Sequence, residues 1–107
     1  MAVHIKTNSE STLVNIQTHP EYFKGEGDRG MHLKAMQELV GGPIQIIRLK
    51  KPVTLEEITY NIMGMNEEGK FSGLKFNAVA TRLARESLFH GDIIVGDAIL
   101  LTDEEVR

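Results

Sequence analysis

The sequence predicts an α+β domain: one mixed β-sheet of about five strands with two helices packed on it, in the order β-β-α-β-β-α-β. Three observations predict this class. Short stretches alternate apolar and polar residues, as half-buried strands do. Two longer stretches place apolar residues at helical spacing. The chain has 107 residues, the size of one domain, so we expect residues 1–107 to share a single core.

The N-terminal residues predict a β-hairpin. Val3 and Ile5 alternate with polar neighbours, which is the period of a short strand. The apolar residues within 13–18 predict a second strand, and the polar residues 8–11 between them are typical of a turn. Residues 19–30 are irregular and rich in glycine, so we expect a long connecting loop there.

The first helix is expected to follow Asp28, whose carboxylate can accept hydrogen bonds from the free N–H groups of the first turn. Apolar residues then recur with spacings of three, three and one, which places them on one helical face; they are Leu33, Met36, Leu39 and Val40. Gly41-Gly42-Pro43 ends the helix, because glycine accepts a left-handed conformation and proline blocks continuation.

The middle of the chain predicts two strands. Residues 44–49 are rich in β-branched side chains and apolar on both faces, which favours a central strand covered on two sides. Residues 54–57 fit the capping box of a helix, whereas the β-forming residues that follow alternate as in a strand. The alternation outweighs the capping pattern, so we expect a strand from about residue 57 to residue 65.

The last third of the chain predicts a turn, a helix and a strand. Residues 66–69 have the sequence of a type I hairpin turn with glycine in the left-handed position, and Phe71 would begin a short returning strand. Asn77 is a good N-cap for a second helix, which we expect to end at His90-Gly91. Residues 92–101 predict a final buried strand with a bulge at its glycine.

The composition narrows the classes of function. Twelve basic against 15 acidic side chains give a net charge of −3, which disfavours binding to nucleic acid by charge attraction. The absence of cysteine excludes a disulfide scaffold, a cysteine nucleophile and a cysteine-ligated zinc site. No stretch resembles a signal peptide or a membrane span. We therefore expect a cytoplasmic protein with no membrane partner, in which residues 102–107 form a solvated acidic tail.

Three motifs follow one another along two-thirds of the chain. They are Met36-Gln37-Glu38-Leu39-Val40-Gly41-Gly42 with Ile44-Gln45-Ile46, then Asn66-Glu67-Glu68-Gly69-Lys70 with Gly73-Leu74 and Asn77-Ala78-Val79-Ala80, and finally Gly91-Asp92-Ile93-Ile94-Val95-Gly96-Asp97-Ala98. Together they resemble a family of small uncharacterised domains of bacteriophages, bacteria and mobile elements. The chain departs from the family's pattern at Pro43, Gln45 and Lys75-Phe76. The resemblance implies a compact intracellular domain, of a kind that phages encode, and transfers no activity.

Six polar side chains are the candidate ligand-binding residues: Asn66, Glu67, Lys70, Asn77, Arg82 and Arg85. Asparagine and glutamate side chains together offer donors and acceptors, which suits the edge of a base or a ribose. Arg82 and Arg85 are three residues apart, so they would share a helical face and could clamp a phosphate. The simpler alternative, that these side chains form a solvated turn and a solvated helix face, stays open.

No catalytic residue, metal site or cofactor is predicted. The four histidines show no zinc-binding spacing; they are His4, His19, His32 and His90. Asp92 and Asp97 are five residues apart on the predicted strand, so regular alternation places them on opposite faces. Only a bulge at Gly96 would bring the two carboxylates together for a divalent cation.

We therefore expect a small non-enzymatic binding module that holds a host protein or a polar, nucleotide-like small molecule. So small a domain offers few deep clefts, and a homodimer is a further expectation. One alternative is a small enzyme that uses carboxylates, with or without a metal, centred on Asp92 or Glu67. The other is a nucleic-acid-binding regulator, which requires the basic side chains to share one surface. These are Arg48, Lys50, Lys51, Lys70, Arg82 and Arg85.

Overall fold

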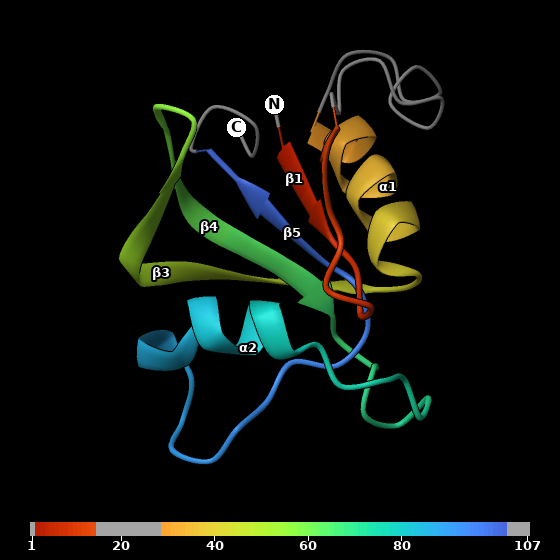
Figure 1. Ribbon diagram of the computed structural model, residues 1–107. Helices are drawn as coiled ribbons and strands as arrows, with labels where there is room; N and C mark the ends of the chain where they lie inside the picture. The colour runs from red at the N-terminus through yellow and green to blue at the C-terminus, as the bar shows by residue number, and fades with distance from the viewer. Residues whose placement is uncertain (1, 15–28, 103–107) are drawn as a thin grey trace.

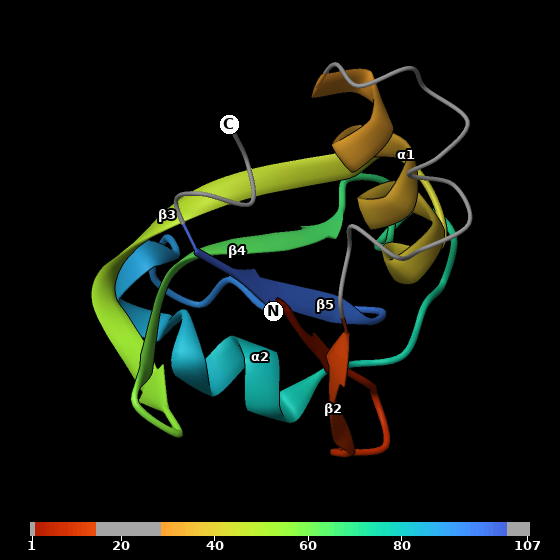
Figure 2. The same cartoon turned by 90° about the horizontal axis from the view of Figure 1, so that it is seen from above.

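The computed structural model describes residues 2–14 and 29–102. Its strands are β1 (Ala2–Ile5), β2 (Ser11–Val14), β3 (Ile44–Leu55), β4 (Ile58–Asn66) and β5 (Ala98–Leu101). They form one sheet in the order β2-β1-β5-β4-β3. Helix α1 (Arg29–Val40) packs on one face of this sheet and helix α2 (Ala78–Leu83) on the other (Figures 1 and 2). The prediction of an α+β domain with five strands and two helices is confirmed.

Every strand pairing is antiparallel, where the sequence predicts a mixed sheet. The path of the chain explains the difference. Strands β2 and β3 are joined through α1 and run in the same direction, but they lie at opposite edges of the sheet and do not pair. Parallel pairing needs a crossover that brings two such strands side by side. The connection through α2 instead joins β4 to β5, which run in opposite directions.

The sheet separates two apolar cores. On the α2 side the core includes Val3, Ile5, Met63, Leu100 and Ala80. On the α1 side it includes Ala2, Ile62, Ile99, Leu101, Ala35 and Met36. All four residues of β5 are buried, so the prediction of a buried last strand is confirmed for residues 98–101. Burial on both faces explains why this stretch is continuously apolar rather than alternating.

The hairpin of β3 and β4 turns at Glu56 and Glu57, whose φ angles are 48° and 70°. Two successive left-handed residues are the geometry of a type I′ turn, which matches the twist of the two strands. The sequence placed a hairpin turn at residues 66–69 instead. That stretch does turn, but no strand pairs back at Phe71, because both edges of β4 are already occupied, one by β3 and the other by β5.

Strand β3 is an edge strand, although its apolar residues predict a central one. Residues 49–52 lie opposite the single residue Asn61 of β4, so the strand bulges and bends sharply (Figure 1). Pro52 fits this irregular stretch because it has no N–H to contribute to a ladder. The bend carries Leu49 into the core on the α2 side, and the backbone N–H of Lys50 donates to Ser87 Oγ at 2.8 Å.

Residues close in sequence determine the end of α1 and the start of α2. Gly41 has a φ of 80°, and the N–H of Gly42 donates to the carbonyl of Gln37, so α1 ends where the sequence predicts. Asn77 caps α2, as predicted, by accepting from the N–H of Ala80. Helix α2 ends earlier than expected and continues as a 3₁₀ turn over Arg85–Ser87.

The first hairpin is confirmed, since β1 and β2 pair with Ala2 opposite Val14. The predicted strand residues beyond 14, residues 19–28 of the predicted loop, the Asp28 cap and residues 103–107 of the acidic tail lie outside the described residues. Arg29 and Gly30, which the sequence assigns to the loop, already belong to α1. Residues 92–97, which the sequence predicts to be the first part of the last strand, form a loop before β5 instead. In this loop Val95 makes an isolated bridge with Phe76, and Gly96, the predicted bulge, has a φ of 79°. None of the helices described is long and apolar enough to cross a membrane.

Candidate functional site

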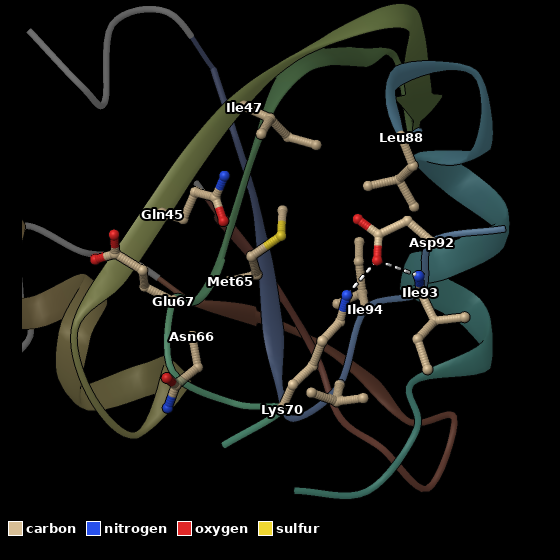
Figure 3. A pocket seen from close by; sticks show the side chains of 11 residues that line it. Gln45, Ile47, Met65, Asn66, Glu67, Lys70, Leu88, Asp92, Ile93 and Ile94 are labelled. Atoms are coloured by element: carbon tan, nitrogen blue, oxygen red, sulfur yellow. Dashed lines mark hydrogen bonds and ion pairs between the residues drawn. The ribbon is translucent and has the colours of Figure 1, made fainter. Parts of the chain in front are cut away.

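Two loops flank α2 and its 3₁₀ turn: residues 67–76 before the helix and residues 88–97 after it. They meet beside the ends of β3 and β4 and border a hollow of about 120 Å³, which we call the loop hollow (Figure 3). Its apolar lining includes Ile47, Met65 and Leu88, and its polar lining is Gln45, Asn66, Glu67, Lys70 and Asp92. Three of the six predicted site residues therefore lie together here.

An ion pair joins the two loops at the loop hollow. The ammonium of Lys70 donates to Asp92 Oδ1, and the backbone N–H of Ile93 donates to the same oxygen at 2.9 Å (Figure 3). The hydrogen bond from Lys70, followed by the one from Ile93, holds the pKa of Asp92 below its usual value of 3.8. Asp92 is therefore ionised at neutral pH, and its carboxylate is already engaged.

Asn66 and Glu67 line the loop hollow in different ways. The Asn66 amide donates to the carbonyl of Val40 at 3.2 Å and accepts from the N–H of Glu68 at 2.8 Å. This side chain is buried and holds the end of α1 against the turn after β4, so its polar atoms serve the fold. Glu67 is exposed at the rim. In Figure 3 both polar groups point away from the centre of the hollow.

Asn77 lies elsewhere and is fully buried. Its amide nitrogen donates to the carbonyls of Ile5, at 3.1 Å, and Gly96, at 2.9 Å, while its oxygen accepts from Ala80 N at 3.0 Å. These three contacts use both donors of the amide and its oxygen. The structure therefore gives Asn77 a structural role and not the ligand contact that the sequence predicts.

The two arginines do not form the predicted clamp on one helix. Arg82 belongs to the last turn of α2, whereas Arg85 begins the 3₁₀ turn after the helix has ended. Arg85 Nη1 donates to the backbone carbonyl of Asp92 at 3.1 Å, which places it beside the loop hollow. Arg82 is exposed and is not part of the lining.

Three of the six basic side chains that a nucleic-acid-binding surface requires can be placed relative to the sheet: Arg48, Lys70 and Arg85. Arg48 lies opposite Ile62 in the register of β3 and β4, so it faces the α1 side. Lys70 and Arg85 stand beside the loop hollow on the α2 side, and the charge of Lys70 is compensated by Asp92. Arg48 therefore does not share one surface with Lys70 and Arg85.

Asp92 and Asp97 do not converge. Asp97 accepts from the N–H of Thr7 at 3.2 Å and pairs with His4 Nε2 at 2.9 Å. It borders a separate hollow of about 370 Å³ at the C-terminal end of α1, which we call the α1-end hollow. Within residues 2–14 and 29–102, no group of three or more histidines or carboxylates could hold a metal ion.

Among the residues that the structure describes, the two most exposed large apolar side chains were not predicted from the sequence to be site residues. Phe71 is 94% exposed and Phe89 is 88% exposed, one on each of the two loops. Phe71 follows Lys70 and Phe89 follows Leu88, so each ring is next in sequence to a residue that lines the loop hollow. A phenylalanine inside a polar, glycine-containing stretch, rather than in a periodic one, is the signal that could have identified them.

The comparison with known families gives one result. Residues 2–106 match the family described as "Domain of unknown function (DUF3846)". No curated protein and no solved structure matches the chain. Because the match covers nearly the whole chain, both loops and the loop hollow lie within the family's domain.

Proposed function

Since the chain belongs to this family of domains of unknown function, we propose its role from the site alone: it is a non-enzymatic module that binds a protein partner through the two loops flanking α2. The observation that carries the proposal is the exposure of Phe71 and Phe89, each of which is next in sequence to a residue that lines the loop hollow. The proposed setting is the cytoplasm, and for a phage-encoded protein the partner is a host protein.

The physical argument begins with the two rings. Aromatic side chains bury a large apolar area and are enriched at the centres of protein interfaces. Lys70, Asp92 and Glu67 supply charged groups around the loop hollow, as in the polar rim of an interface. A partner that covers Phe71 and Phe89 would remove both rings from water while these charged groups stay at the solvated border.

The size of the loop hollow indicates what it accepts. A dry cavity of about 150 Å³ takes a molecule the size of benzene, and sites for drug-sized ligands reach about 300–1,000 Å³. At about 120 Å³ the loop hollow suits one inserted side chain of a partner and is too small for a nucleotide. This comparison favours a protein over a nucleotide-like ligand at this place.

The hydrogen bonds that Asp92 accepts from Lys70 and Ile93 argue against the alternative of an enzyme whose catalytic group is Asp92. A general acid or base is most effective when its pKa lies near the working pH. The hydrogen bonds from Lys70 and Ile93 shift the pKa of Asp92 in the other direction, below 3.8. The same contacts suit a residue that fixes two loops in place for binding.

Affinity purification from cells that naturally contain the protein tests the proposal. The tagged parent is compared with F71S/F89S and with the control Ile46→Ser, which alters an exposed aliphatic residue of the edge strand β3. We expect a partner that the parent and the control retain and the double variant loses. Photoreactive benzoylphenylalanine at positions 71 and 89 should cross-link to the same partner. Equal recovery with the double variant, or no partner at all, would contradict the proposal.

A second candidate function, binding of a polar small molecule, is favoured by the α1-end hollow. Its volume of about 370 Å³ reaches the size range of small-molecule sites, and its polar lining includes Thr7, Lys75 and Asp97. Native mass spectrometry of the protein from its natural cells tests this candidate. A stoichiometric small molecule that is lost in Lys75→Ala would support it, and a bare protein would exclude it.

A further inference from the structure

The tip of the β3–β4 hairpin borders a third hollow, of about 230 Å³, which we call the hairpin hollow. Its lining comes from β1, β2 and the hairpin, and among the described residues that line it none belongs to α2 or to the two loops. Val3 and Tyr60, which form its base, also belong to the core on the α2 side. The hairpin hollow is therefore a separate place on the same side of the sheet.

The walls of the hairpin hollow are apolar and open to solvent. Leu13 is 53% exposed, Leu55 is 41% exposed and Ile58 is 37% exposed, whereas Val3 and Tyr60 beneath them are buried. Single exposed aliphatic residues are ordinary, but three that gather around one hollow form a patch of the kind that marks an interaction site. The register supports the grouping, since Leu13 pairs with Val3 and Leu55 pairs with Ile58.

The turn at the tip carries two carboxylates in a strained conformation. Glu56 and Glu57 both have positive φ, a region that costs energy for any residue with a Cβ and is favoured by Asn-Gly in type I′ turns. Glu56 lines the hairpin hollow and Glu57 follows it. Non-glycine residues in left-handed conformations gather at functional sites, where the strain is kept for a reason other than stability.

We propose that the hairpin hollow binds an extended segment of a partner protein that presents an apolar side chain next to a lysine or arginine. The aliphatic walls would cover the apolar side chain, and the carboxylates of Glu56 and Glu57 would pair with the neighbouring cation. Among the described residues that line the hollow there is no lysine, arginine or histidine, so the charge there is negative only. This complementarity selects a basic segment over an acidic or a neutral one.

Short synthetic peptides test the proposal directly. The probes are Lys-Leu-Lys-Leu-Lys and its acidic counterpart Glu-Leu-Glu-Leu-Glu, both blocked at the ends and titrated into isotope-labelled protein. We expect the lysine peptide to shift the methyl signals of Leu13, Leu55 and Ile58 saturably, and Ile58→Ser to abolish the shifts of Leu13 and Leu55. No saturable shift up to about 5 mM peptide, or equal binding of the acidic peptide, would overturn the proposal. Methyl shifts that depend on protein concentration without peptide would also overturn it, because a second copy would then occupy the hollow.

A variant of the turn separates binding from folding. E56N/E57G keeps the type I′ geometry with the residues that favour it and removes both carboxylates. We expect its thermal midpoint to rise by about 4–16 °C, because the strain of two left-handed glutamates is relieved, while lysine-peptide affinity falls about tenfold. The control Glu86→Gln removes an exposed carboxylate of the 3₁₀ turn and should bind as the parent does. Unchanged affinity in E56N/E57G would overturn the role of the carboxylates.

Discussion

Two neighbouring parts of this chain reverse the usual distribution of residues between interior and surface. Asn77 is polar and fully buried, and it joins β1, the loop before β5 and the start of α2. Phe71 and Phe89, on the loops at either side of the same helix, are apolar and almost fully exposed. The Asn77 amide therefore holds three segments of the fold together, whereas the two rings stay in contact with solvent. We therefore expect substitution of Asn77 to lower stability, and substitution of Phe71 and Phe89 to change binding while leaving stability nearly unchanged.

The largest effect on stability is expected from Asn77→Ala. The substitution leaves the carbonyls of Ile5 and Gly96 without this donor and removes the cap of α2. Buried groups left unsatisfied cost about 1–3 kcal/mol each and a lost cap about 1 kcal/mol, so we expect the free energy of unfolding in urea to fall by at least about 3 kcal/mol. The control Asn8→Ala, in an exposed turn, should cost less than about 1 kcal/mol. Equal losses of stability in the two variants would contradict the structural role of Asn77.

A smaller effect of opposite sign is expected at the hairpin tip. In E56N/E57G the turn is formed by residues that accept positive φ, so the strain of two glutamates is relieved. We expect the free energy of unfolding to rise by about 1–2 kcal/mol, measured by urea denaturation. A fall in stability would mean that the two carboxylates stabilise the fold. The hairpin tip would then have a structural role, as Asn77 has, and would not resemble the exposed rings.

The sequence predicted features of the fold that depend on local chemistry. The Gly41-Gly42-Pro43 stop and the Asn77 cap are confirmed because neighbouring residues decide them. Features that depend on distant partners were missed. The antiparallel pairing of the sheet and the edge position of β3 depend on which strands become neighbours in the fold. The β-propensity of a single segment carries no information about its neighbours. The turn at Glu56 was missed because its residues disfavour the conformation that the hairpin imposes.

The candidate site was predicted in part for the same reason. Glu67 and Lys70 share one turn, so their grouping could be predicted from the sequence. Asn77 was correctly identified as a cap, but its further partners Ile5 and Gly96 lie 72 and 19 residues away, and its burial could not be foreseen. Phe71 was interpreted as the start of a strand, because an apolar residue is ordinarily evidence of burial.

A modest, pH-dependent effect is expected at the ion pair that joins the loops. The pKa of Asp92 is lowered in the folded protein, so its contribution is present above its unfolded value of 3.8 and is lost as pH falls through the folded pKa. Asp92 is a third exposed, so solvent screening keeps the contribution small. We expect Asp92→Asn to lower the urea midpoint slightly at pH 7 and not at about pH 2. Lys70→Gln should reproduce the loss at pH 7, and an equal effect of Asp92→Asn at both pH values would contradict this account.

The smallest effect on stability is expected from the two exposed rings. Phe71 and Phe89 bury little surface in the folded chain, so F71S/F89S should change the free energy of unfolding by no more than about 0.5 kcal/mol per site. Replacing exposed rings by serine should also raise solubility, because an apolar patch favours association. Urea denaturation and light scattering of parent and variant measure the two quantities. If the variant were destabilised by more than about 2 kcal/mol, the two rings would contribute to the stability of the fold. A loss of partner binding could then result from unfolding and could not be assigned to the loss of a contact surface.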